Sequence, residues 1–370
     1  MKYVDEDDKT GEPFSPRAGE GGVEQWLKSA VRGWMGKLSD AYRLSELSIP
    51  GTHDSGARFG GLAAECQDFT IKQQLEAGIR FFDIRCRIWH DDTHPFRFFI
   101  HHGIFYQNLS FDDVLTTFRD FLNANPTECL IINVQEEYEE HVARQHNTAE
   151  PDQKAELDGE RAFLYIWKYY MNERGFLPYF YQGGDMNPTL GKMRKKIFVV
   201  RGHGAIIPSV VTSLDPSDVQ MQNYYAVNWV PYDSGPSDPD NNASNVTLPA
   251  KVRLAKEFLQ KTIRGDPLKW RLNYLSGSTG AAPDTVANST NPAIYEEIGS
   301  YNHANGKKRV GVILMDFPGE KLIYRIIRTN FTFNSNTSIY TLMASSRLTG
   351  SRRFQDRINT IIAATNHMMN

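Results

Sequence analysis

The sequence predicts an α/β fold, an irregular TIM-type barrel of parallel strands with peripheral helices. Two observations favour it. Short apolar segments recur along the chain, and helical patterns with clear start and stop signals separate several of them. Strands and helices that alternate in this way are typical of a TIM barrel. The early crossovers are short, so we expect the barrel to be irregular. The apolar segments are residues 47–49, 79–84, 98–101, 129–134, 197–200, 224–229, 272–275 and 310–315.

Composition sets limits on function. The chain has 370 residues, is 40% hydrophobic and carries a net charge of −3. That is enough apolar material for a large core, and it predicts no broad attraction to nucleic acid. Residues 1–22 are charged and rich in Gly and Pro, which predicts disorder. We expect residues 23–370 to form a single catalytic barrel domain with N- and C-terminal helices, and the protein to be a monomer.

Residue preferences mark several helix boundaries. Ser110 can cap a helix over 111–123, with Asp113 at the capping-box position. Pro249 suits the first turn of a later helix, and the Asn-Pro pair at 291–292 is expected to open another.

Two further segments show helical spacing of apolar residues, 23–38 and 154–174. The first carries Trp26 and Trp34. Packing of this helix against the domain is the expected arrangement, and contact of its aromatic face with lipid headgroups is the alternative.

The cysteines show no zinc-binding spacing and no disulfide pattern, so we expect buried thiols at Cys66, Cys86 and Cys129. The N-terminus does not resemble a signal peptide, and no apolar run could span a membrane. A complete chain would therefore be cytoplasmic. The alternative is a secreted protein whose signal has been removed, hinted at weakly by glycosylation sequons at Asn108, Asn242, Asn245, Asn288, Asn330 and Asn336.

Four of the predicted strand ends carry residues suited to catalysis. His53 and Asp54 follow the first apolar segment, where a Pro-Gly pair at 50–51 is expected to turn the chain. A histidine titrates near neutral pH, so it can take or give a proton. Side chains alternate along a strand, so Asp83 and Arg85 share one face of the second strand.

The third predicted strand ends in His101 and His102, of which alternation allows only one to point into the barrel mouth. The eighth ends in Asp316. Each feature alone has a structural explanation, because Asp and His at strand ends often cap or turn the chain. An Asp-x-Arg pair is also often an internal ion pair.

Together, however, two histidines, an arginine and three carboxylates at one rim fit cleavage of a phosphodiester. One histidine would remove a proton from the attacking hydroxyl, and the other would protonate the leaving alkoxide, each held by a carboxylate. The arginine would pair with the phosphate oxygens. A metal site is the rival use, but Arg85 would repel a divalent ion, and no HxH or HExxH spacing occurs.

Three motifs carry a family resemblance: Ile-Pro-Gly-Thr-His-Asp-Ser-Gly at 49–56, Phe-Asp-Ile-Arg at 82–85 and His-His-Gly at 101–103. They resemble the X-domain of phosphatidylinositol-specific phospholipase C in its bacterial-type form, over about Trp34 to Asn330. The resemblance implies a distorted barrel and cleavage without a metal ion or cofactor, since calcium-dependent relatives carry an acidic residue in place of Arg85.

Carried over by motif, the resemblance makes His53 the general base, supported by Asp316. It makes His102 the general acid, supported by Asp54. Arg85 would bind the phosphate.

Asp83 would lie beside this arginine. The inositol 2-hydroxyl would attack phosphorus, releasing diacylglycerol and inositol 1,2-cyclic phosphate.

Recognition of the headgroup departs from the family pattern. Bacterial relatives surround the sugar with lysine, arginine and aspartate. Here Glu136 stands where a lysine is expected, and Asn223 stands for the aspartate. Tyr225 fits a stacking tyrosine, and Arg201 is a candidate for the arginine.

The expected partner is an inositol phospholipid. A transient membrane contact through Trp229, Tyr232 and the N-terminal tryptophans is possible. Two alternatives stay open, a metal-dependent phosphodiesterase acting on glycerophosphodiesters and a catalytically idle lipid-binding module.

Overall fold

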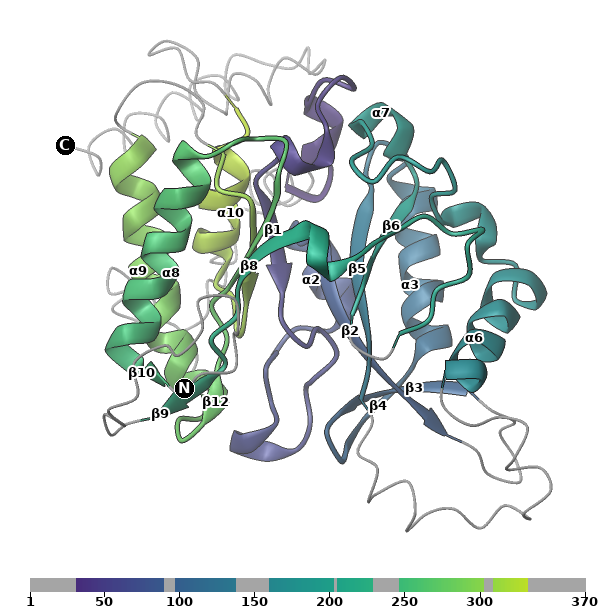
Figure 1. The fold of residues 1–370 in the computed structure, drawn as a ribbon, viewed down its shortest axis with the longest axis horizontal. Coiled ribbons are helices and arrows are strands. Elements are labelled where there is room, and N and C mark those ends of the chain that lie inside the picture. Colours follow the sequence, from purple (N-terminus) through teal and green to yellow (C-terminus); the bar gives the residue numbers. More distant parts are fainter. Residues whose placement is uncertain are drawn as a thin grey trace, which may run out of the picture.

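Eight parallel strands form the centre of the molecule (Figure 1). The computed structural model describes residues 31–89, 97–137, 160–202, 205–228, 246–302 and 309–331. Neighbouring strands follow the order β7-β6-β5-β2-β1-β13-β11-β8, and no pairing joins β7 to β8 in the described part of the chain. The sheet is therefore an incompletely closed barrel, which confirms the predicted irregular TIM-type fold. Its strands are β1 (Ile49–Thr52), β2 (Phe81–Trp89), β5 (Leu130–Glu136), β6 (Ile197–Arg201), β7 (Ser213–Leu214), β8 (Val219–Gln222), β11 (Trp270–Tyr274) and β13 (Val312–Met315).

Two predicted barrel strands were wrong. The segment 98–101 lies in β3 (Arg97–His102), which pairs antiparallel with β2 and continues into β4 (Phe105–Ser110). The segment 224–229 contributes β9 (Ala226–Asn228), which belongs to a separate three-stranded sheet. Their places in the barrel are taken by β7 and β8. The first is only two residues long, and the second has glutamines at alternate positions, so neither stands out as an apolar run.

The Pro-Gly pair at 50–51 was predicted to turn the chain, but both residues lie within β1. A side chain at Gly51 would place its Cβ 2.9 Å from the Cβ of Phe81. Glycine therefore lets β1 approach β2 closely, and the chain turns only after Thr52.

Helices cover the outside of the barrel, with α8 and α9 side by side next to β8 (Figure 1). Ser110 and Asp113 form the expected capping box of α3, and α8 begins with a proline in its first turn. The Asn-Pro pair at 291–292 opens no helix, because α9 begins at Pro283 and continues through Pro292. The helices are α2 (Ile71–Glu76), α3 (Phe111–Ala124), α6 (Glu160–Lys168), α7 (Leu190–Met193), α8 (Leu248–Arg264), α9 (Pro283–Asn302) and α10 (Glu320–Arg328).

The expected helices over 23–38 and 154–174 are described in part. Trp34–Lys37 forms a short 3-10 helix, η1, and Tyr169–Glu173 adds a π-helical turn after α6. Trp34 is fully buried, so its side chain packs in the core and is closed to lipid. Residues 1–22, Trp26 and the N-terminal part of each segment lie outside the described residues.

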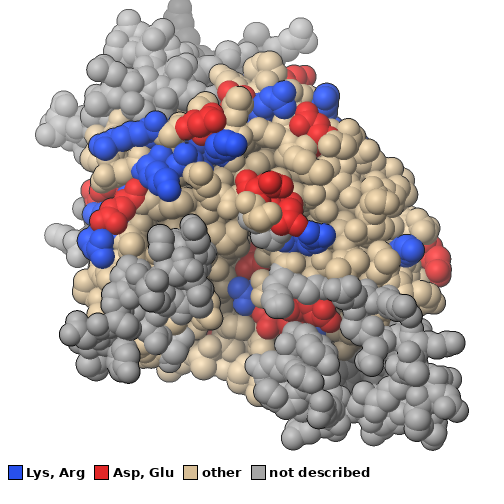
Figure 2. All heavy atoms as spheres, in the orientation of Figure 1, with Lys and Arg blue, Asp and Glu red and all other residues tan. Residues whose placement is uncertain are grey.

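The small sheet joins β9 to β10 (Val246–Thr247) and β12 (Ser278–Thr279). Within the described ranges, no helix is long and apolar enough to cross a membrane. On the face shown in Figure 2, acidic and basic side chains of the described residues are interspersed.

All three cysteines are buried and free, as predicted. The fold buries the asparagine of one of the predicted glycosylation sequons. Asn330 is 3% exposed, and its side-chain amide bonds the backbone N–H and C=O of Ser48. A glycan on Asn330 would break both bonds.

The length of β2 positions the site. Its first six residues, from Phe81 to Cys86, pair with β5, and its last four, from Cys86 to Trp89, pair with β3. Because β3 runs antiparallel to this extension, its C-terminal end returns towards the barrel rim. Cys86 opposes Ile100, so His102 arrives near the level of Arg85. The carboxyl ends of β1, β2, β5 and β13 meet at the same rim, since these strands are parallel.

Candidate active site

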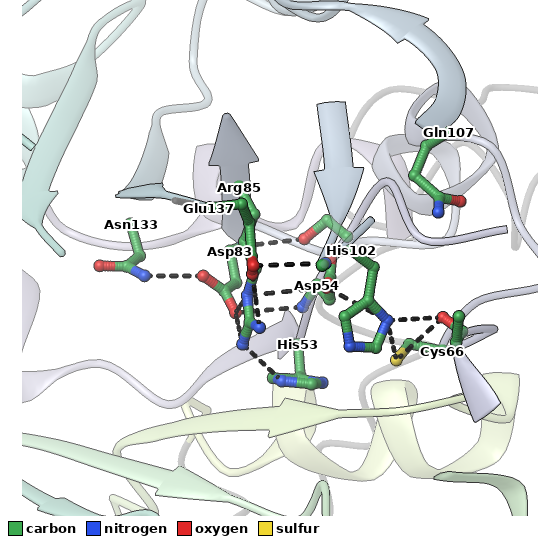
Figure 3. Close-up of polar contacts among 12 residues, drawn as sticks. His53, Asp54, Cys66, Asp83, Arg85, His102, Gln107, Asn133 and Glu137 are labelled. Atoms are coloured by element: carbon green, nitrogen blue, oxygen red, sulfur yellow. Dashed lines mark hydrogen bonds and ion pairs between the residues drawn. The ribbon is translucent and has the colours of Figure 1, made fainter. Parts of the chain in front are cut away.

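Arg85 occupies the centre of the rim and contacts three carboxylates (Figure 3). Its guanidinium lies 3.0 Å from Glu137, 3.2 Å from Asp83 and 3.6 Å from Asp54. Burial lowers the pKa of Arg85, but these carboxylates outweigh burial and raise it well above its usual range. The group is therefore a fixed cation, and 17% of the side chain is exposed.

His53 lies between this cation and Asp316. Its Nδ1 is 2.8 Å from Oδ1 of Asp316, which is almost fully buried, and its Nε2 is 2.7 Å from Nη2 of Arg85. A proton on Nδ1 donated to the carboxylate leaves the lone pair of Nε2 facing the guanidinium. The amide of Gln67 fixes the backbone beneath, donating to the C=O of His53 at 2.7 Å.

His102 approaches from the other side of Asp54. Its Nδ1 donates to the carbonyl of Ala64 at 2.7 Å and lies 3.6 Å from Oδ2 of Asp54. The side chain is 21% exposed. His101, its neighbour on β3, is buried against Tyr106, and burial lowers the pKa of this histidine to about 4. Only His102 faces the site, as strand alternation requires.

Asp54 and Asp83 have opposite electrostatic environments although both are buried. Burial raises the pKa of Asp54 to about 8, with Arg85 and His53 opposing it. Neither carboxylate oxygen of Asp54 has a hydrogen-bond partner in the structure. Burial also acts to raise the pKa of Asp83, but Arg85, His53 and two hydrogen bonds lower it overall.

Those hydrogen bonds come from the amide of Asn133 at 2.7 Å and the backbone N–H of Asp54 at 3.1 Å. The backbone of Asp54 is left-handed, with φ 38°. Aspartate is one of the few residues that adopts this conformation readily. This backbone conformation turns the chain sharply after β1, so that the N–H of Asp54 can donate to the carboxylate of Asp83.

Glu137 is the main residue that sequence reasoning missed. Its Oε1 accepts from Arg85 at 3.0 Å, and its Oε2 accepts from the backbone N–H of Gly103 at 3.3 Å. Glu136 was chosen instead, but it lies one residue earlier, on the opposite side of β5. Alternation could have found the correct residue, because Asp83 pairs with Asn133 in register, and Glu137 lies four residues further on the same face.

The other three residues proposed for the headgroup lie at or just after the ends of β6 and β8. Arg201 ends β6 and forms an ion pair with Asp215. Asn223 and Tyr225 follow β8, and Tyr225 is 47% exposed, which leaves its side chain accessible for stacking. Their roles in binding, and that of Glu136, stay predictions.

The site could also hold a metal ion at one of two groups of residues in the described part of the chain. Cys66 belongs to both, once with His53 and Asp316 and once with Asp54 and His102. Arg85 contacts a member of each group. A metal ion in either group would therefore lie close to a fixed positive charge.

A parallel barrel whose rim holds two histidine–carboxylate pairs beside a guanidinium defines a class, that of barrel enzymes that cleave phosphodiesters. Comparison with known proteins shows which of these enzymes the chain is similar to. Residues 42–155 match the family model "Phosphatidylinositol-specific phospholipase C, X domain". Over these residues the chain is similar to that family.

Two curated relatives are named 1-phosphatidylinositol phosphodiesterase. The one from Listeria monocytogenes is 29% identical over 322 residues, 82% of this chain and 87% of the relative. The one from Staphylococcus aureus strain Newman is 27% identical over 308 residues, 79% of this chain and 90% of the relative.

Solved structures share the fold. The phosphatidylinositol-specific phospholipase C of Listeria monocytogenes has a TM-score of 0.61 at 24% identity, over 81% of this chain and 99% of that one. A Staphylococcus aureus structure, from work on modulation of membrane binding, has a TM-score of 0.62 at 24% identity, over 82% and 99%.

Proposed function

We propose that this protein cleaves phosphatidylinositol, or a related inositol phospholipid, as a phospholipase C. The inositol 2-hydroxyl attacks phosphorus and the bond to the glycerol oxygen breaks. The products are inositol 1,2-cyclic phosphate and diacylglycerol. The observation that carries the proposal is the convergence of His53, His102 and Arg85 at one rim. The match of residues 42–155 to the family model and the names of the relatives support the substrate class.

We propose one step for each side chain, and the geometry supports it. With Nδ1 bonded to Asp316, His53 presents a basic Nε2 that takes the proton of the attacking hydroxyl. Arg85 occupies this nitrogen in the free enzyme. When a phosphate oxygen binds the guanidinium, Arg85 would move away from His53, and Nε2 of His53 would become free to accept a proton. Arg85 then stabilises the charge that grows on the phosphate.

His102 serves as the acid. Its Nδ1 bonds the carbonyl of Ala64, so the ring is oriented with Nε2 available to protonate the leaving alkoxide. Asp54 lies 3.6 Å from Nδ1 and, when it is ionised, supports the positive charge of the ring. We propose that no metal ion takes part, because Arg85 already supplies the positive charge that a metal would bring to the phosphate.

The test is cleavage of phosphatidylinositol in the presence of a chelator, with cyclic and open inositol phosphates distinguished among the products. His53→Ala and His102→Ala should each lose on the order of 10²–10⁴-fold in rate. His101→Asn is the matched control, since this neighbour faces away from the site and should retain activity. Full activity in either alanine variant would overturn the assignment.

The same assay separates the alternatives. A metal-dependent phosphodiesterase would lose activity in chelator and regain it with a divalent ion. An idle lipid-binding module would bind vesicles but release no inositol phosphate.

An apolar cluster beside His102 suggests how the enzyme meets lipid. Five large hydrophobic side chains are more than 40% exposed there: Phe59, Leu62, Ile104, Phe105 and Tyr106. The cluster comes from two segments, one with Phe59 and Leu62 and one with residues 104–106. The side-chain amide of Gln107 holds them together, since it bonds the backbone of both Phe59 and Phe105. We infer that this cluster contacts the membrane surface. Trp34 is buried, and Trp229 and Tyr232 lie outside the described residues.

Polar substitution tests this surface. Leu62→Asn combined with Ile104→Asn should weaken vesicle binding without slowing cleavage of a water-soluble substrate. Leu268→Asn is the control, because Leu268 is 52% exposed at the opposite end of the barrel, before β11. Equal vesicle binding by the double variant and the wild type would show that this cluster is not the membrane contact.

A further inference from the structure

We propose that Cys66, Asp54 and His102 form a binding site for a thiophilic divalent cation such as Zn²⁺, and that its occupation silences the enzyme. Cys66 is fully buried beside the site and has no part in the chemistry above. Its Sγ, a carboxylate oxygen of Asp54 and a ring nitrogen of His102 all lie within 4.8 Å of one another. Figure 3 shows the thiol directed at the imidazole.

The distances suit zinc. For Zn–S near 2.3 Å and Zn–N or Zn–O near 2.0–2.1 Å, tetrahedral ligands lie roughly 3.5 Å apart for S···N and roughly 3.3 Å for N···O. Here Sγ of Cys66 is 3.9 Å from Nδ1 of His102, which is 3.6 Å from Oδ2 of Asp54. The third separation, between Sγ of Cys66 and the Asp54 oxygen, lies within 4.8 Å, so the three groups must draw closer together to bind the ion.

An independent observation points to a ligand. Both oxygens of Asp54 are buried without a hydrogen-bond partner, and only Oδ2 has charged neighbours, Arg85 and His102, each 3.6 Å away. A bound cation would give one of these oxygens a direct partner. Arg85 opposes cation binding, but Asp83 and Glu137 also contact this guanidinium. When these carboxylates are ionised, negative charge is in excess around Arg85.

The second group that contains Cys66 is less suited to metal. In it, His53 has both ring nitrogens engaged, one with Asp316 and one with Arg85. His102 has only its Nδ1 engaged in the described contacts, with the carbonyl of Ala64. The donor set of one thiolate, one imidazole and one carboxylate is typical of zinc and poor for Ca²⁺ or Mg²⁺, which prefer oxygen ligands.

Binding would disable the acid. The thiol of Cys66 and Nδ1 of the protonated His102 each release a proton to solvent as they bind the ion, which must overcome the burial that raises the pKa of the thiol. The imidazole then exchanges its bond to Ala64 for the metal. Asp54 is drawn to the ion as well, so the ring can no longer carry the positive charge that protonation of the alkoxide requires. The silencing rests on the proposed function, whereas the metal site does not.

The experiment titrates the full chain with Cd²⁺ and Zn²⁺ in the absence of substrate. Cd²⁺ should produce the ultraviolet absorption of a cadmium–thiolate bond with one ion per chain, and Zn²⁺ should displace it. Zn²⁺ should also inhibit lipid cleavage reversibly, with activity returning on chelation, while Ca²⁺ and Mg²⁺ at the same concentration do not inhibit.

Cys66→Ser should bind at least tenfold more weakly while keeping basal activity. Cys86→Ser, which removes another buried thiol, should bind as the wild type does. Cys66→Ala replaces the serine variant if circular dichroism shows that the latter is unfolded. Absence of the thiolate absorption, or unchanged affinity in the folded Cys66 variant, would overturn the proposal. If the chain cleaves no lipid yet binds Cd²⁺ through Cys66, the proposed function fails and the metal site stands.

Discussion

Three carboxylates share one guanidinium, and their pKa values diverge because their other partners differ. Asp83 accepts hydrogen bonds from Asn133 and the backbone N–H of Asp54, which favour its ionised form. Asp54 has no such partners, and burial raises its pKa to about 8. Asp54 thus holds a proton at a pH where Asp83 is ionised, although both lie within 4 Å of Arg85.

The pKa of Asp54 predicts a pH dependence of stability. Between its ordinary value of 3.8 and about 8, the folded protein keeps a proton that the unfolded chain releases. The contribution of Asp54 is therefore most favourable below pH 4 and is lost as the pH rises towards 8. The difference in unfolding free energy between wild type and Asp54→Asn should fall over this range, by up to ~1.4 kcal/mol per pH unit. Urea denaturation between pH 5 and 8 measures it, and a constant difference would contradict the raised pKa.

Glu137 is expected to position Arg85 and the turn that follows His102, since it bonds both the guanidinium and the N–H of Gly103. A charged hydrogen bond contributes about 1.5–3 kcal/mol, so Glu137→Gln should lower kcat about tenfold or more. Glu136→Gln serves as the control and should have little effect on kcat. Equal kcat values for the two variants would contradict this role.

Among the elements, β3 determines whether the site is assembled. It carries the acid, and it reaches the rim only because β2 extends beyond its pairing with β5. Gly56 sets the approach of β3 to the loop after β1. A Cβ at Gly56 would lie 2.5 Å from Cγ2 of Ile100, closer than real contacts allow.

Gly56→Ala should therefore displace β3 and with it His102. A displacement of about 1 Å can cost on the order of 10²-fold in rate. Ile100→Ala removes the clashing methyl group, so the double variant should recover much of the activity relative to Gly56→Ala, although Ile100→Ala alone destabilises the core. Steady-state kinetics on all three variants provide the measurement, and a double variant as inactive as Gly56→Ala would exclude the steric explanation.

Across the whole molecule, a buried ion pair joins the N-terminal segment to the barrel. Arg80 and Glu128 are both fully buried and lie 3.0 Å apart, just before β2 and just before β5 respectively. Glu128 also accepts from the backbone N–H groups of Met35 and Gly36 in η1. The loop before β5 thereby holds both the barrel and the segment that packs on it.

Removing this carboxylate should be costly. Glu128→Gln leaves the Arg80 cation buried without its counterion, and loss of one partner of a buried pair costs roughly 3–5 kcal/mol. Glu257→Gln is the matched control, because Glu257 pairs with Arg253 on the exposed surface of α8, where such pairs contribute less than about 1 kcal/mol. Denaturant unfolding of both variants gives the comparison, and similar losses would contradict a special role for the buried pair.

The sequence by itself determined the elements and most of the site residues. Helix caps such as Ser110 and strand periodicity are local properties, and the motif around His53 and Asp54 is contiguous. The direction of β3, the barrel strand β8 and the contact of Glu137 with Arg85 were decided only by tertiary structure. Strand direction depends on pairing partners far away in the chain, and a short polar strand is stabilised by the sheet it joins rather than by its own residues. For the same reason, the convergence of Cys66 with Asp54 and His102 became visible only in the fold.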